Sequence, residues 1–532
     1  MKKTNKRRSL VRLAIYIALA TLAIGPLAYS TSGNRIKSFF SLKSSQSRGA
    51  TRGGGQSGAV AQSSITPDTV SQIVALEAEK TSRTPNQMKI DSQLLQAVKT
   101  SRGEQMAAGV NLEAIDTHAD DAGAVLIDID ATVSDALVTD LETMGVTVIY
   151  PSFEYNTIRA KADLSQMELI AGLADVKFVQ LAVRSITSGM PGKNRPAGPV
   201  IAPNHTVLGG NRPSFAERAA NVRQQLTKAL AKSAVAAPFF TGTINSQGDR
   251  AHRADDLRNT FGYSGSGVRI GVLSDSFNNQ GGAAADVASG NLPGPGNPLG
   301  NLTPVTVVQD IASAGSDEGR AMLQIVHDLA PKAQLFFATA DVSEAGFAAN
   351  IQALRNAPNN CDIIIDDVFY FDESPFQDGI VAQAVNTVTT AGALYFSSAG
   401  NEGNVTKNTA GYFEGDFDDT GSPAFTFPGG TKTGTIHNFS GTNGDIITAA
   451  GQAYTLNWAD PAGAATDDYD LFLVSSTGTV KASSTNIQNG TQNPFEQINA
   501  PALASGDRLV VFKTAASAKV AFAINTIRGT LS

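Results

Sequence analysis

Buried strands that alternate with helices over residues 265–401 constrain the fold of this chain more than any other feature. Apolar strands are predicted at 267–275 (GVRIGVLSD), 333–340 (AQLFFATA), 361–368 (CDIIIDDV) and 392–401 (GALYFSSAGN). Helices are predicted between them at 319–329, 342–356 and 378–391. Strands that are apolar along their length and separated by helices indicate a parallel sheet. We therefore expect an α/β fold with a doubly wound parallel sheet.

Polar side chains gather where these strands end. Asp275, Asp366, Asp367 and Asn401 all fall at the carboxyl ends of predicted strands. Reactive groups of parallel sheets lie beyond those ends. The pattern predicts a functional site at this edge, although an aspartate that ends a strand is often a turn residue, and SAGNEG could be a simple strand-to-loop turn.

A smaller α+β region precedes the parallel sheet. VLIDIDA (125–131) predicts a strand, VSDALVTDLETMG (133–145) a helix, VTVIY and NTIRAKA two strands, LSQMELIAGLADV a helix and VKFVQLA a last strand. The order βαββαβ is that of ferredoxin-like domains. From these residues alone, the region can equally well be interpreted as an ordinary small α+β domain without a specialised role.

Three segments of the α/β region carry a resemblance to a known family. GSGVRIGVLSDSF resembles the segment that carries the catalytic aspartate of subtilisin-like serine peptidases, which would be Asp275. ALYFSSAGNEG resembles the segment with the oxyanion-hole asparagine, which would be Asn401. EGRAMLQIVHDLAPKAQLFFATA is similar to the histidine segment, with Glu318 in place of the histidine. The resemblance covers roughly 250–405 and implies a peptide-bond hydrolase whose α+β region is an inhibitory prodomain.

Glu318 has two interpretations. It resembles the glutamate of the sedolisins, in which an aspartate follows one helical turn later, but position 322 is Met322. If Asp275 and Glu318 meet, they should titrate as a coupled pair with best activity in mild acid. Alternatively, Ser316, Asp317 and Glu318 only cap the helix. His327 lies nine residues later, about 13 Å along the helix and on its other side, so it cannot replace the histidine.

The nucleophile is the largest departure from the family pattern. The Gly-Thr-Ser-x-Ala segment that would carry the catalytic serine is not found in the sequence. We expect a truncated or inactive homologue, which could be a fragment, a frameshifted product or a pseudoenzyme. Removal of Asp275 or Glu318 is expected to leave folding largely intact and to abolish any peptidase activity.

Residues 408–532 predict short strands separated by turns, and DDYDLFLVSSTGTVKASS resembles β-sandwich modules beside secreted bacterial proteases. Asp467, Asp468 and Asp470 could ligate calcium there, although three acidic residues in a turn are usually only solvated. No other cofactor is expected.

The amino terminus predicts export. A basic start and the apolar run LAIYIALATLAIGPLA (13–28) indicate a signal peptide or a membrane anchor, and Arg7-Arg8 also permits a twin-arginine signal. We expect a secreted or cell-envelope protein that meets the membrane only through this segment. The net charge of −7 gives no reason to expect a nucleic-acid partner, and the single Cys361 excludes an internal disulfide framework.

These observations predict an exported subtilisin-like serine endopeptidase homologue, with polypeptide as substrate and its own prodomain as intramolecular inhibitor. The alternative is a non-catalytic surface protein that binds protein or glycan on a protease fold. The expected organisation is a signal peptide or anchor (1–30), a flexible linker (31–67), a helical lead-in with the inhibitor-like prodomain (68–186), a linker (187–247), an incomplete catalytic domain (248–407) and a β-sandwich (408–532).

Overall fold

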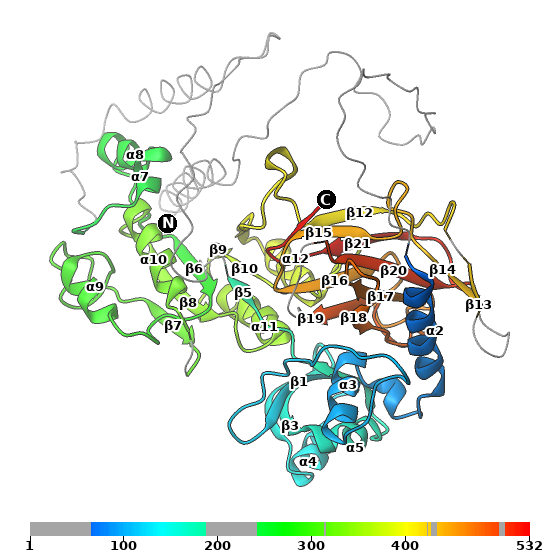
Figure 1. The fold of residues 1–532 in the computed structure, drawn as a ribbon. Helices are drawn as coiled ribbons and strands as arrows, with labels where there is room; N and C mark the ends of the chain where they lie inside the picture. The colour runs from blue at the N-terminus through cyan, green and yellow to red at the C-terminus, as the bar shows by residue number, and fades with distance from the viewer. Residues whose placement is uncertain (1–64, 188–241, 313–314, 423, 427–432, 500–505) are drawn as a thin grey trace, which may run out of the picture. The chain divides into compact units, whose positions relative to one another are not determined.

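The computed structural model describes residues 65–187, 242–312, 315–422, 424–426, 433–499 and 506–532 (Figure 1). Its contacts divide the chain into two compact units. The first includes 242–267 and 325–332, and the second includes 65–187, 268–324 and the described residues from Ala333 onward. The predicted signal or anchor, residues 31–64 of the first predicted linker and residues 188–241 of the second lie outside the described residues. Within the described ranges, no helix is both long and apolar enough to cross a membrane.

The described part of the first unit contains two short helices, α7 (Gln247–Ala251) and α8 (Ala254–Phe261). Arg258 pairs with the buried Asp249 at 2.6 Å, and Asp328 accepts the backbone N–H of Ser246 at 2.6 Å. These contacts tie α7 and α8 to the last turn of α10 (Glu318–Leu329).

A five-stranded parallel sheet forms the α/β part of the second unit, as predicted. Its order is β11-β9-β6-β8-β7, and every neighbouring pair is parallel. The strands are β6 (Arg269–Ser274), β7 (Thr306–Gln309), β8 (Gln334–Thr339), β9 (Ile363–Asp366) and β11 (Leu394–Ser397). The helices α10, α11 (Glu344–Arg355) and α12 (Ile380–Thr390) lie where the periodicity predicts them. The edge strand β7 and the short helix α9 (Ala283–Ser289) were not predicted.

Burial on both faces of the sheet explains why the central strand β6 is so apolar. It pairs with β8 on one side and β9 on the other, and all but its first residue are buried. At Gly271 a Cβ would lie 2.9 Å from the Leu354 side chain of α11, so glycine allows this helix to approach the sheet closely. The pattern of central strands between helix layers therefore follows from burial on both faces.

The α+β region has the predicted element order and an antiparallel sheet in the order β2-β3-β1-β4. Its elements are β1 (Ala124–Ala131), α4 (Asp135–Thr143), β2 (Thr147–Ser152), β3 (Thr157–Asp163), η2 (Leu164–Gln166) with α5 (Met167–Ala171), and β4 (Val176–Leu181). Burial alternates along β1, with Ile127 and Ile129 in the core and Asp128 and Asp130 on the opposite face. Two helices precede it, α2 (Pro67–Ser82) and α3 (Ser92–Ser101), separated by the turn η1 (Gln87–Lys89).

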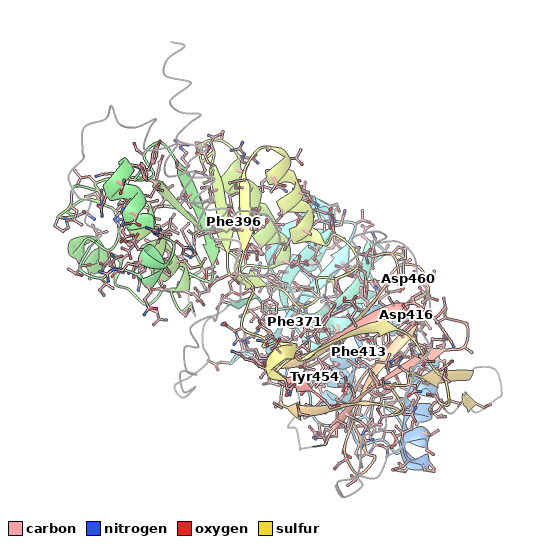
Figure 2. The ribbon with its side chains drawn as sticks, turned by 90° about the horizontal axis from the view of Figure 1, so that it is seen from above. Phe371, Phe396, Phe413, Asp416, Tyr454 and Asp460 are labelled. Carbon is pink, nitrogen blue, oxygen red and sulfur yellow. The ribbon has the colours of Figure 1, made fainter. Side chains whose placement is uncertain are left out.

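The C-terminal region is antiparallel, as predicted, and its two sheets share one hydrophobic core. One sheet has the order β12-β21-β16-β19, and the other contains β13, β14, β20, β15 and β22, with β17 beside β20 and β18 beside β17. Phe413 of β12 and Tyr454 of β16, labelled in Figure 2, contribute to this core from the first sheet. The strands are β12 (Tyr412–Asp416), β13 (Ala424–Thr426), β14 (Thr433–Ile436), β15 (Asp445–Ala449), β16 (Ala453–Trp458), β17 (Tyr469–Val474), β18 (Val480–Ser484), β19 (Phe495–Asn499), β20 (Arg508–Thr514), β21 (Ala521–Asn525) and β22 (Thr530–Leu531).

Candidate functional site

Asp275 lies directly after β6 and binds the beginning of helix α10. Its carboxylate accepts the backbone N–H of Glu318 at 3.0 Å, and it also accepts the N–H and the hydroxyl of Ser316 and the N–H of Ser276. The first N–H groups of a helix have no partner within the helix and carry a partial positive charge, so a carboxylate is favourable there. Asp275 therefore joins the sheet edge to α10.

The capping arrangement differs from the alternative considered for the sequence. The buried Asp317 has a left-handed backbone (φ 63°) and accepts hydrogen bonds from the Ser276 hydroxyl and from the N–H groups of Asn279 and Gln280. It thus orders the loop after β6, while Asp275 from the neighbouring strand binds the N–H groups at the start of α10. Ser316, Asp317 and Glu318 are therefore not simply a local helix cap.

Gly319 explains how α10 can begin so close to the sheet. A Cβ at this position would lie 2.3 Å from the Phe337 ring of β8 and 2.8 Å from the backbone oxygen of Ser276. Both distances are shorter than real Cβ contacts, so a larger residue would push the helix away from the sheet. Glycine at 319 therefore fixes the position of the neighbouring Glu318.

The side chain of Glu318 meets Asp367 at the end of β9. The expectation was a coupled pair between Asp275 and Glu318, but Asp275 contacts the backbone of Glu318, and the coupled carboxyl partner is Asp367. Burial and the adjacent Glu318 carboxyl raise the pKa of Asp367 to about 8. Glu318 Oε2 and Asp367 Oδ1 are buried and receive no hydrogen bond from another donor group. The proximity of the two buried carboxyls thus favours the protonated form of Asp367.

The side chain of Asp366 contacts the neighbouring strand β11. Its Oδ1 accepts the hydroxyl of Ser397 from β11 at 2.7 Å and the N–H of Val368 at 3.3 Å. Burial raises the pKa of Asp366. These contacts are those of a side chain that connects neighbouring strands, and they assign Asp366 a structural place at the edge.

Asn401 lies in the exposed loop that follows β11. Its backbone N–H donates to the Glu402 carboxylate at 2.6 Å. The strands β11 and β6 are separated by β9, and two strand spacings correspond to about 10 Å. Asn401 thus follows β11 at the same edge, but the side chains that meet there are those of Glu318 and Asp367, and Asp275 binds the backbone of Glu318.

A short ladder runs directly past this cluster. The strand β10 (Val368–Phe369) follows Asp367 without a gap and pairs antiparallel with β5 (Ile186–Thr187). The register places Val368 opposite Thr187 and Phe369 opposite Ile186. The chain's own segment after the α+β region therefore lies in extended conformation beside the carboxyl cluster. No sequence signal marked this pairing, because two-residue strands have no periodicity.

Two described histidines, His327 and His437, are buried in other surroundings. His327 is buried in the last turns of α10, and its burial lowers its pKa to about 4. His437 is buried in the C-terminal region, where its Nδ1 accepts the N–H of Asp418 at 3.0 Å, and burial lowers its pKa to about 4.

The calcium candidate is replaced by an ion cluster. Lys80 Nζ lies 2.7 Å from Asp468 and 2.8 Å from Asp470, while Asp467 accepts the N–H of Ala518 at 2.6 Å. An ammonium group thus stands between the two carboxylates that calcium would need. Among the residues that the structure describes, no group of three or more His, Cys, Asp or Glu side chains could hold a metal ion.

Comparison with known proteins gives partial similarities of fold. No protein-family model matches the sequence, and no curated protein matches it. The chain is similar to the CspB protease of Clostridium perfringens (12% identity, 53% of this chain and 67% of that chain, TM-score 0.31). It is also similar to the epidermin leader peptide processing serine protease of Staphylococcus aureus (11% identity, 54% and 62%, TM-score 0.26).

A third similar structure is fervidolysin from Fervidobacterium pennivorans, a keratinolytic enzyme related to subtilisin (11% identity, 52% and 40%, TM-score 0.24). The chain thus covers between 40% and 67% of the length of these three proteins. At such TM-scores the similarities are distant, and the functional argument rests on the geometry of the described residues.

Proposed function

We propose that this protein is a subtilisin-like peptidase homologue that binds polypeptide in extended conformation along β10. The observation that carries the proposal is the ladder between β5 and β10 immediately after Asp367. A strand added to an exposed edge gains backbone hydrogen bonds whatever its sequence, which is a common mode of polypeptide recognition. A bound peptide would pass beside Asp275, Glu318 and Asp367.

The second part of the proposal is that the α+β region is an intramolecular inhibitor. It contacts the α/β part through Arg159, which donates to the backbone oxygen of Val342 at 3.1 Å, and through Tyr155, whose hydroxyl accepts from Gln352 at 2.8 Å. Ser185 donates to Asp341 just before β5 begins. These contacts hold β5 on the strand that a substrate would need, so the segment competes with polypeptide.

The chemistry proposed for the cluster is acid–base. A carboxyl pair that shares one proton can donate and accept protons at once, and Asp275 orients the helix that carries Glu318. Asn401 is proposed as an oxyanion donor once polypeptide is bound, because an amide aimed at a developing oxyanion stabilises it. Serine-type hydrolysis also needs a nucleophile, and the sequence contains no Gly-Thr-Ser-x-Ala segment. We therefore expect polypeptide binding without serine-type cleavage, in an exported protein.

The alternative function is binding of protein or glycan that does not involve this edge. The absence of the serine segment favours it, because binding needs no nucleophile. The two functions differ in the effect expected when the β5–β10 ladder is lost. Loss of the ladder should tighten ligand binding only if the ligand binds along β10.

The test is a double substitution, Ile186→Pro with Thr187→Pro, which removes both backbone N–H donors of β5. The matched control, Ile186→Val with Thr187→Ser, keeps them. Fluorescence anisotropy with labelled casein peptides should show at least tenfold tighter binding to the proline variant than to the parent and the control. A fluorophosphonate probe should label none of the three. Equal peptide affinity in all three proteins would refute the proposed binding edge, and labelling together with casein cleavage would show that the nucleophile is present after all.

A further inference from the structure

The helices α2 and α3 cover one face of the C-terminal β region. Along β17, Leu471 and Leu473 enter the core between the two sheets, whereas Phe472 and Val474 belong to a second core with Ile73 of α2 and residues of α3. All six residues of β17 and all seven of β20 are buried. The helix α2 lies beside β13 and β18 (Figure 1). The sheet is therefore buried on both faces only while the helices remain in place.

A buried ion cluster lies within this contact. Lys80 of α2 pairs with Asp468 and Asp470, and the side chains of Lys80 and Asp470 are 4% and 0% exposed. Burial alone would lower the pKa of Lys80, but the two aspartates raise it above its usual value. Glu77 and Glu496 lie close to the same group and are also buried. Separation of α2 from the sheet would therefore break a largely buried charge network.

Hydrogen bonds along the sheet edge extend the contact to α3. Arg83 donates to the backbone oxygen of Thr485 at 2.8 Å, Asn486 accepts the N–H of Ser92 at 2.8 Å, and Gln93 accepts the N–H of Asn499 at 3.0 Å.

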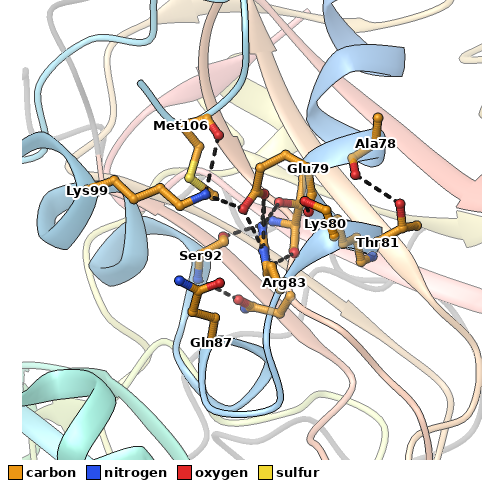
Figure 3. Close-up of polar contacts among 12 residues, drawn as sticks. Ala78, Glu79, Lys80, Thr81, Arg83, Gln87, Ser92, Lys99 and Met106 are labelled. Carbon is orange, nitrogen blue, oxygen red and sulfur yellow. Dashed lines mark hydrogen bonds and ion pairs between the residues drawn. The ribbon is translucent and has the colours of Figure 1, made fainter. Parts of the chain in front are cut away.

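The helices are also tied to each other. Figure 3 shows the carboxylate of Glu79 between Arg83 and Lys99, at 2.7 Å and 2.6 Å. Because Lys99 belongs to α3, this network makes α2 and α3 one piece that binds the sheet through both helices.

We propose that Pro67–Ser101 is a permanent structural component of the C-terminal β region, and that it stays bound to this region after the chain is cut between residues 188 and 241. This inference goes beyond the proposed function, since it concerns a surface away from the carboxyl cluster. The helical lead-in shares one hydrophobic core with the α+β region and also packs on the β region, whereas the α+β region also contacts the α/β part. A cut chain would keep its inhibitory region tethered, so the block on β10 would persist by proximity.

The experiment uses the full chain with a site-specific protease sequence inserted between residues 188 and 241. After cleavage, the two pieces are passed through a size-exclusion column in native buffer, and their dissociation constant is measured by dilution. We expect co-elution of the parent pieces. Lys80→Met should weaken their association at least tenfold, because Asp468 and Asp470 lose their cation. Lys161→Met, which removes an exposed ion pair with Asp120 in the same piece, should change it less than twofold.

Two further variants separate a specific contact from general unfolding. Lys80→Met combined with Asp470→Leu removes the cation together with the more deeply buried of its two aspartates and should recover part of the lost affinity. Gln93→Ala buries no new charge and should weaken association several-fold without loss of folding. Separate elution of the two pieces of the cleaved parent protein would overturn the proposal. Equal effects of Lys80→Met and Lys161→Met would overturn it as well, and neither outcome depends on peptide binding at β10.

Discussion

The carboxyl groups of Glu318, at the start of α10, and Asp367, at the end of β9, lie against each other at the carboxyl edge of the parallel sheet. Two buried carboxylates in contact cannot both be ionised without a large electrostatic cost. Asp275 holds the helix that carries Glu318, and Gly319 allows that helix to approach the sheet. The contact between Glu318 and Asp367 therefore depends on the packing of three elements, β6, α10 and β9.

Asp367→Asn should stabilise the protein increasingly as the pH rises. The folded-state pKa of Asp367 is about 8, well above its ordinary 3.8. Its protonated form therefore contributes fully below pH 4, and stability is lost as the pH rises from about 4 to about 8. Asparagine has no such loss, so the variant should gain up to about 6 kcal/mol over the parent across this range, because the pKa rises from 3.8 to about 8 and each pKa unit corresponds to about 1.4 kcal/mol. Thermal unfolding at pH 4, 6 and 8 measures the gain.

The control for this prediction is Asp121→Asn, which neutralises an exposed carboxylate. It should leave the pH dependence of the melting temperature unchanged. Parallel pH profiles for Asp367→Asn and the parent would mean that Asp367 is ionised in the folded protein.

Asp275→Ala should destabilise the fold by about 1–3 kcal/mol, because the N–H groups of Glu318 and Ser316 lose their acceptor. The sequence alone predicted that this removal would leave folding largely intact, and the hydrogen bonds of Asp275 make that expectation too simple. Glu318→Gln keeps the backbone contact and should cost less than about 1 kcal/mol. Urea unfolding of the three proteins decides between these values. If Asp275→Ala were as stable as the parent, the carboxylate would not be anchoring α10.

Arg159→Met should loosen the α+β region from the α/β part. Arg159 is 4% exposed, forms a 2.6 Å ion pair with Asp128, and donates to the backbone oxygen of Val342. Burial and the nearby Asp128 raise the pKa of Asp372 to about 7, so the site is already rich in negative charge. Removal of one partner of a buried pair typically costs about 3–5 kcal/mol.

Hydrogen exchange measures this effect at the amides of β5 and β10, which should exchange at least tenfold faster in Arg159→Met. The matched control is Arg102→Met, which breaks the more exposed pair with Glu168 in the same region. Exchange rates at β10 that are equal in the two variants would show that Arg159 does not hold the region in place.

Local patterns predicted most of the α/β part. The strands β6, β8, β9 and β11 and the helices α10, α11 and α12 all lie within a few residues of their predicted positions. The lead-in at 68–105 contains two helices, and the α+β region has its predicted order. These elements are encoded by burial that repeats along short stretches of chain, and the sequence displays such repeats directly. The two-residue strands β5 and β10 have no such signal.

The candidate site was predictable only as far as chain order determines it. The sequence by itself predicted that Asp275, Asp366, Asp367 and Asn401 belong to one edge, because parallel strands end together. Only the tertiary structure decided that Asp275 binds the backbone of α10, that Glu318 pairs with Asp367, and that Lys80 occupies the carboxylates proposed for calcium. Each of these contacts joins residues that are far apart in the chain, and their partners depend on side-chain direction and on how close the elements pack. Periodicity reports burial along one element, and carries no information on which neighbour lies across the contact.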